Sequence, residues 1–224
     1  MRWKLLLGFI SLVGAIAYGI AIVGMYDSGL FEVPQFRAAF IGFVVGAFLW
    51  LVLSRKLAFF ATFEHELTHL IFTILMFQRP RSFYASERKG HVASDSGNFL
   101  DGLAPYFFPT FSYVLLAIYP ILRSSAQTVF YPLLGFLTGF HLVSNIMEFE
   151  PRQSDIRKTG LVFSFLFCTF AGAVTFGFIA AFVISGFRGG LDFLVIGAES
   201  VIDVVAGGAE MAWRGINGLA SPAQ

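Results

Sequence analysis

Residues 57–77 read LAFFATFEHELTHLIFTILMF, an apolar run with His65, Glu66 and His69 near its middle. A run of this length is enough to cross the hydrocarbon core of a bilayer as a helix. Positions i and i+4 share one face of a helix, so the two imidazoles can bind one Zn²⁺, with the glutamate beside them as a general base. The stretch therefore predicts an HExxH metal site inside a transmembrane helix.

Two histidines hydrogen-bonded inside a helix bundle are the alternative without a metal. Ionisable groups near the centre of a membrane helix cost about 2.5–3.5 kcal/mol each on insertion scales, so two histidines together with Glu64 and Glu66 need a compensating partner. A divalent metal is such a partner, and we favour it. Glu64 has no role in the motif and is a candidate for an ion pair or for a contact behind the metal ligands.

The composition is that of a membrane protein. Of 224 residues, 57% are hydrophobic and 13% charged, and the mean hydropathy is +0.75. These values predict an all-α, polytopic protein embedded in a lipid bilayer. The net charge is +1 with scattered basic residues, which argues against a nucleic-acid surface. Cys168 is the single cysteine, which excludes an intrachain disulfide and a multi-cysteine metal site.

Apolar runs predict about six transmembrane helices, at residues 5–25, 36–53, 57–77, 99–122, 129–149 and 161–187. Ser54, Arg55 and Lys56 form a tight connection between the second and third of them. The fourth contains Pro105 and Pro109, which lack backbone donors and predict a kinked or broken helix.

Two segments outside these spans have a character of their own. Residues 82–86 and 91–94 can pair as a short hairpin after the HExxH helix, although an ordinary exposed loop fits the composition equally well. Residues 188–218 are apolar but carry charged side chains at intervals of seven and four, which predicts an amphipathic helix at the membrane interface or against a partner. Those side chains are Asp192, Glu199, Asp203, Glu210 and Arg214.

Catalytic zinc usually has three protein ligands, so His65 and His69 need a third from elsewhere. Asp101, His141 and Asp155 are the candidates. His141 lies as deep in its span as His69 does, so depth alone favours it. It also shares one helix face with Asn145 and Glu148, a polar stripe that is unfavourable in contact with lipid.

HELTH in a transmembrane helix, with the later segment NIMEFEPRQSD at residues 145–155, resembles the site-2 protease family of intramembrane zinc metalloproteases. The resemblance covers residues 57–187 and implies that Asp155, on the third of three core helices, is the third zinc ligand. Asp101 stands in a literal Leu-Asp-Gly but falls on the next span, too early for the family order. Here Ile156 replaces the glycine of the family's Asp-Gly. Asp155 also lies beyond the predicted span, so the chain must fold back to reach the zinc.

The resemblance also implies an activity and a division of the chain. Zinc would activate water and polarise the scissile carbonyl, while Glu66 acts as general base and then acid. Asn145 and His91 are candidate substrate contacts, the latter in an edge strand that can pair with an unwound substrate. Residues 1–56 would be an accessory transmembrane hairpin, 57–187 the metalloprotease core and 188–224 an interfacial tail.

The implied substrate is a membrane protein with a single span, cleaved by an integral protein of the bacterial inner membrane. The main alternative is a non-catalytic scaffold with a structural or vestigial zinc site, bound to a partner subunit through the C-terminal helix. A transporter that uses Glu64, His141 and Glu148 as an ion path is weaker, because no inverted repeat is visible.

Overall fold

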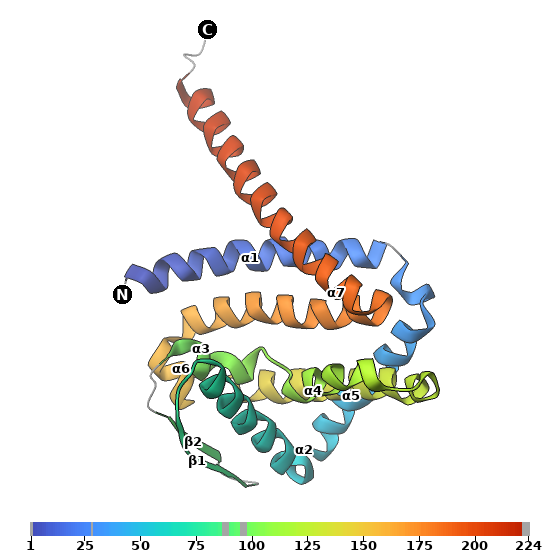
Figure 1. Ribbon diagram of the computed structural model, residues 1–224. Helices are drawn as coiled ribbons and strands as arrows, with labels where there is room; N and C mark the ends of the chain where they lie inside the picture. The colour runs from blue at the N-terminus through green and yellow to red at the C-terminus, as the bar shows by residue number, and fades with distance from the viewer. Residues whose placement is uncertain (1, 28, 87–89, 95–97, 221–224) are drawn as a thin grey trace.

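Helix dominates the structure because a backbone in lipid must find its hydrogen-bond partners within its own segment. The computed structural model describes residues 2–27, 29–86, 90–94 and 98–220 (Figure 1). The principal elements are α1 (Arg2–Asp27), α2 (Pro34–Leu75), β1 (Pro80–Ala85), β2 (Gly90–Ser94), α3 (Phe99–Leu103), α4 (Thr110–Ile118), α5 (Gln127–Glu148), α6 (Ser154–Thr159) and α7 (Leu161–Ala220). Within these residues, four 3₁₀ turns connect them: η1 (Leu30–Glu32), η2 (Ala104–Tyr106), η3 (Tyr119–Ile121) and η4 (Ser124–Ala126). The chain is an all-α membrane protein with one small hairpin.

The described residues contain fewer separate helices that could cross a membrane than the six that we predicted. In the described part of the chain, α1, α2, α5 and α7 are long and apolar enough to span a bilayer, and a bent helix pair is a fifth candidate. The difference arises at residues 54–56, which continue α2 and do not form a loop, because serine, arginine and lysine are all compatible with a helix. The helix only bends, at Leu53 (φ −117°, ψ 19°). The predicted division after residue 56 therefore falls inside α2.

The proline-bearing span is broken, as predicted. It consists of residues Phe99–Tyr106 and Thr110–Ile121, whose axes differ by 81°. Pro105 and Pro109 lie at this break and cannot donate backbone hydrogen bonds. The break gives the chain a corner beside the second half of α2.

The predicted hairpin is also confirmed. Strands β1 and β2 pair antiparallel, with Phe83 opposite Val92 and Tyr84 opposite His91. Residues 87–89 of the predicted turn lie outside the described residues. The ring of Phe83 packs edge-on against Phe63 of α2, at 5.9 Å between centroids, which holds the hairpin beside the motif helix.

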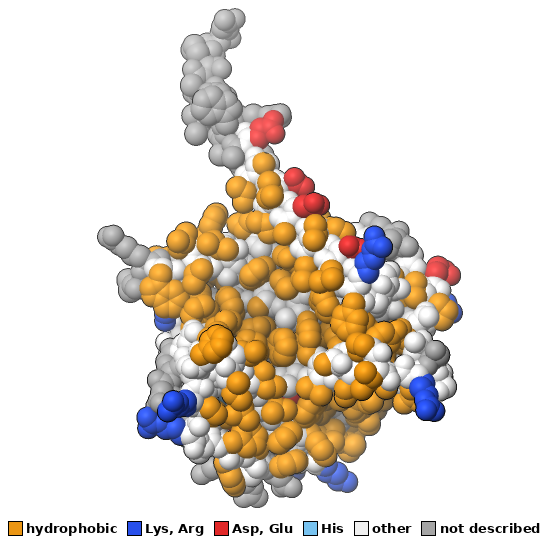
Figure 2. All heavy atoms as spheres, in the orientation of Figure 1, with side chains coloured by type: hydrophobic (Ala, Val, Ile, Leu, Met, Phe, Trp, Pro, Cys, Tyr) orange, Lys and Arg blue, Asp and Glu red, His pale blue; other side chains and the backbone are white. Residues whose placement is uncertain are grey.

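Helix α7 bends at Ser185 and Gly186, the latter at φ 66°, a conformation that glycine adopts without strain. Its second half packs on α1, where Tyr18 donates to the Leu194 carbonyl at 3.0 Å, and its end then extends away from the body (Figure 1). The predicted tail is thus helical, and the acidic side chains of its stripe are exposed along it (Figure 2). The side chain of Arg214 lies outside the described residues.

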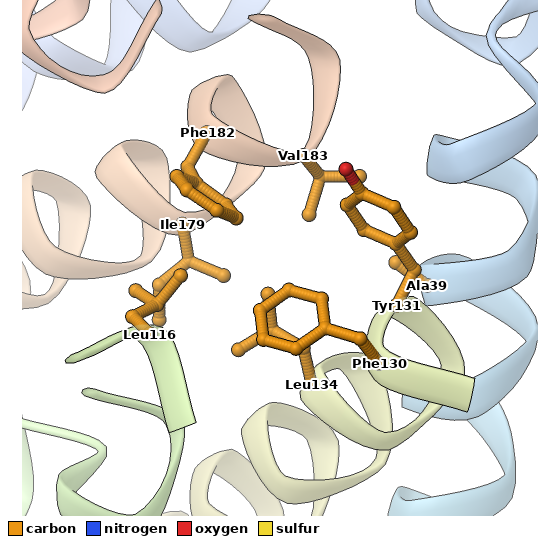
Figure 3. Packing of buried hydrophobic residues seen from close by; sticks show 8 residues of the cluster. All are labelled: Ala39, Leu116, Phe130, Tyr131, Leu134, Ile179, Phe182 and Val183. Atoms are coloured by element: carbon orange, nitrogen blue, oxygen red, sulfur yellow. The ribbon is translucent and has the colours of Figure 1, made fainter. Parts of the chain in front are cut away.

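Buried aromatic and aliphatic side chains fill the space between α5 and α7. The cluster in Figure 3 comprises Phe130, Tyr131 and Leu134 of α5, Ile179, Phe182 and Val183 of α7, and Leu116 and Ala39. Apolar side chains also cover the outer surface in Figure 2, with Lys and Arg at its margins. Such a surface suits contact with lipid.

Glycines bring α2 and α5 into close contact. A Cβ atom on Gly135 or Gly139 would overlap the carbonyl oxygen of Ala39 or Phe43 in α2, and Gly42 and Gly46 of α2 meet the α5 backbone in the same way. Glycines four residues apart allow helix backbones to approach closely in membranes. This contact sets the position of the motif helix relative to residues 141–148 of α5.

We expect Gly139→Ala to destabilise the protein, because the added methyl group meets a backbone carbonyl that cannot turn away. Overpacking of this kind costs about 1–3 kcal/mol. Thermal unfolding in detergent measures the loss. Gly19→Ala is the matched control, since no described atom lies within 4 Å of its Cβ position, and it should leave stability unchanged or higher. Equal losses in the two variants would contradict the packing role.

Candidate metal centre

The motif histidines lie one turn apart on the second half of α2. Their ring centroids are 4.9 Å apart, and each side chain is largely buried, His65 14% and His69 13% exposed. Helical spacing alone produces this arrangement. The two imidazoles therefore form one side of a possible metal site, and a third ligand must approach them from another element.

Asp155 makes this approach. After α5 ends, hydrogen bonds from Glu150 N to Glu148 O (2.8 Å) and from Gln153 N to Glu150 O (3.0 Å) turn the chain back. The short helix α6 follows, anchored by the fully buried side chain of Ile156. One ligand atom each from His65, His69 and Asp155 then lies within 4.8 Å of the other two.

The distances suit a metal ion. Bonds of about 2.0–2.1 Å at a tetrahedral angle place neighbouring ligand atoms about 3.3 Å apart. His69 Nε2 and Asp155 Oδ2 are 3.7 Å apart, so small movements would complete the geometry. His65 Nδ1 is buried and has no hydrogen-bond partner among the described residues. The cluster thus fits a zinc ion, because two imidazoles and one carboxylate that zinc prefers lie close together.

The charge state of Asp155 also suits this role. Burial alone would raise the pKa of its carboxyl group, but the adjacent His69 imidazole lowers it more, so that the pKa lies below its ordinary value. Asp155 is therefore ionised at neutral pH, the form in which a carboxylate binds a metal.

The backbone of α3 orients His69. Nδ1 of this ring lies 2.9 Å from the carbonyl oxygen of Asp101, and a carbonyl can only accept, so Nδ1 carries the proton. Nε2, on the side of Asp155, is then the nitrogen that would bind a metal once it has lost its proton. Such a contact behind a histidine ligand fixes its tautomer and ring orientation.

Two neighbours of His65 were not among the predicted site residues. Glu148 Oε2 lies 3.7 Å from His65 Nδ1, and the ring of Tyr106 packs edge-on against the imidazole at 5.4 Å between centroids. The helical spacing from His141 to Glu148 had predicted that Glu148 faces away from lipid. Nothing in the sequence pointed to Tyr106, which the broken span brings to the site.

A cavity of about 550 Å³ opens beside the cluster, and Glu66 shares it with His69 and Asp155. His91 of β2, the predicted substrate contact, also lines it. The backbone of Gly90 lies directly against the Glu66 side chain, where a Cβ atom would overlap the carboxylate. The hairpin therefore covers the proposed general base.

The other candidates make different contacts. Asp101 lies behind His69, with its carboxylate 3.6 Å from Nδ1, on the opposite side of the ring from Nε2. His141, which the depth argument favoured, is not in the cluster, because Glu64 Oε2 lies 3.1 Å from its Nδ1 and both side chains are buried. Asn145 donates to the His141 carbonyl at 2.9 Å and does not line the cavity beside Glu66.

Comparisons with protein-family models, with curated proteins and with solved structures find no significant match.

We expect purified protein to bind about one zinc per chain, and His65→Ala, His69→Ala and Asp155→Ala each to remove most of it, because two remaining ligands seldom hold the ion. Asp101→Asn should retain zinc, since the main contact to His69 comes from the backbone. Metal content by elemental analysis checks all four. Zinc lost in Asp101→Asn but kept in Asp155→Ala would reverse the assignment.

Glu148→Gln should bind zinc about 10- to 100-fold more weakly, because the variant removes the negative charge next to His65. Chelator competition measures the affinity. Glu150→Gln, at an exposed position two residues on, changes the same charge away from the cluster and should match the wild type. Equal affinities in the two variants would exclude a role for Glu148.

Proposed function

We propose that the protein is an intramembrane zinc metalloprotease that hydrolyses a peptide bond in a membrane-embedded substrate. The observation that carries this proposal is the grouping of His65 and His69, on a helix apolar enough to cross a bilayer, with Asp155 of α6. Glu66 of the same long helix lines the adjoining cavity. The resemblance of HELTH and residues 145–155 to the site-2 protease family points to the same activity.

His65, His69 and Asp155 would hold the zinc, which supplies a Lewis acid that activates water at neutral pH and polarises a peptide carbonyl. Glu66 accepts a proton as the water oxygen bonds to the carbonyl carbon. It then donates that proton to the amide nitrogen as the C–N bond breaks, leaving a carboxylate and an amine. The Glu66 side chain is buried under Gly90, which would keep its carboxylate near the water that the zinc activates.

The hairpin offers a means of holding the substrate. A helical substrate buries its carbonyls in its own hydrogen bonds and must unwind locally before cleavage. A two-stranded ribbon can pair a further extended segment along its edge. Gly90, His91 and Val92 of β2 line the cavity with Glu66, so a segment paired with this strand would run past the general base.

A second cavity, of about 570 Å³ and mostly apolar, lies between α5 and α7. Asn145 and Tyr106 line it, and the Asn145 Oδ1 and Tyr106 hydroxyl atoms are buried with no hydrogen-bond partner in the described chain. The Asn145 amide already donates to His141, so its free capacity is as an acceptor. This suits a backbone N–H of an unwound substrate.

The family resemblance further suggests a substrate with a single transmembrane helix and a location in the bacterial inner membrane. A non-catalytic scaffold with a structural or vestigial zinc site is the alternative to be separated from the protease. The protease requires the Glu66 carboxylate as a general base. The scaffold does not require it, because Glu66 is not among the three clustered ligands.

Glu66→Gln keeps the size of the side chain but cannot accept a proton, so the variant should fold and bind zinc yet fail to cleave. Removing a general base costs about 10²–10⁴ in rate. The membrane proteomes of cells carrying the wild type or Glu66→Gln provide the readout, with uncut single-span proteins accumulating in the variant.

Glu150→Gln controls for the loss of a charge and should behave as the wild type. If Glu66→Gln restores a deletion phenotype fully and no membrane protein accumulates, the scaffold replaces the protease. If the purified wild type binds no zinc, the protease fails and only a scaffold with a vestigial zinc site remains.

A further inference from the structure

The first turn of α1 reaches the candidate metal centre, although we predicted residues 1–56 to be accessory. Trp3 and Lys4 line the same cavity as Glu66 and Asp155. Lys4 Nζ donates to the carbonyl oxygen of Thr159 at 2.7 Å and lies 3.5 Å from that of Lys158. These two carbonyls belong to the last residues of α6, the helix that carries Asp155.

Helix α6 needs such a contact because it is only six residues long. The last carbonyls of a helix have no partner within it, and a lysine side chain can bind them. The helix stops at Gly160, whose φ of 97° turns the chain into α7. One end of α6 is therefore held by a residue 155 positions away in the sequence.

Trp3 fixes the position of Lys4. Its ring lies 5.5 Å from that of Phe99 at the start of α3 and 5.8 Å from that of Phe163 at the start of α7, between centroids. The first turn of α1 thus touches the elements on both sides of α6. A lysine that served only to anchor α1 at the membrane surface would need none of these contacts.

We propose that Trp3 and Lys4 form a clamp that positions α6, and with it Asp155, relative to the histidines of α2. Lys4 is a positioning residue, since it acts on the metal through α6. The inference rests on the proposed zinc site but not on the reaction. A ligand displaced by a fraction of an ångström binds more weakly, so loss of the clamp should appear as loss of zinc affinity.

The test compares Lys4→Met, which removes the donors but keeps an unbranched apolar side chain, with Lys4→Arg, which restores donors to the same carbonyls. Lys56→Met, at an exposed position of α2, is the matched control for the lost charge. Two quantities are measured in the full-length protein in detergent. They are the zinc affinity, by chelator competition, and the amide hydrogen exchange of residues 154–160 without metal.

We expect Lys4→Met to weaken zinc binding about 10- to 100-fold and to speed exchange in α6, while Lys4→Arg and Lys56→Met behave as the wild type. Unchanged affinity and exchange in Lys4→Met would overturn the clamp, as would equal effects in Lys56→Met. If the wild type binds no zinc, the proposed zinc site fails, and the exchange of α6 still decides whether the clamp exists. If Lys4→Met does not fold, Lys4→Gln, whose side chain is too short to reach Thr159, replaces it.

Discussion

The contact between Glu64 and His141 ties the motif helix to the rest of the protein. Their side chains are 2% and 1% exposed, and Glu64 also accepts from the Phe111 backbone at 3.0 Å, so α2, α4 and α5 meet at one carboxylate. Removing one partner of a buried ion pair typically costs about 3–5 kcal/mol. Since Glu64 precedes His65 in the sequence, the pair also sets which way the motif faces.

The candidate centre is assembled from elements that have little stability of their own. The six-residue helix α6, a two-stranded ribbon and the broken span each lack the length to be stable alone. Each is held through a specific contact. Ile156 anchors α6 in the core, Phe83 of the ribbon packs against Phe63, and the Asp101 carbonyl of the broken span contacts His69. The long helices provide the frame, and these short elements place the third carboxylate and cover Glu66.

Several features followed from local patterns. The apolar runs predicted the helices, the prolines predicted the break near residues 105–109, and polar residues after the motif allowed a hairpin. The continuity of α2 through the bend at Leu53 was not predictable from the sequence. A short polar connection between two helices and a bend within one helix have the same composition there. The glycine pairs at 42 and 46 and at 135 and 139 are a signal in the sequence for the α2–α5 contact.

The sequence by itself determined that His65, Glu66 and His69 lie together inside an apolar helix, because helical periodicity is local. It left Asp101, His141 and Asp155 as open candidates until a family resemblance favoured the last. Only the tertiary structure decided that Asp155 turns back to His69, that His141 pairs with Glu64, and that Lys4 reaches Thr159. These contacts join residues 77 to 155 positions apart, and such pairings depend on how whole helices pack, which no local pattern encodes.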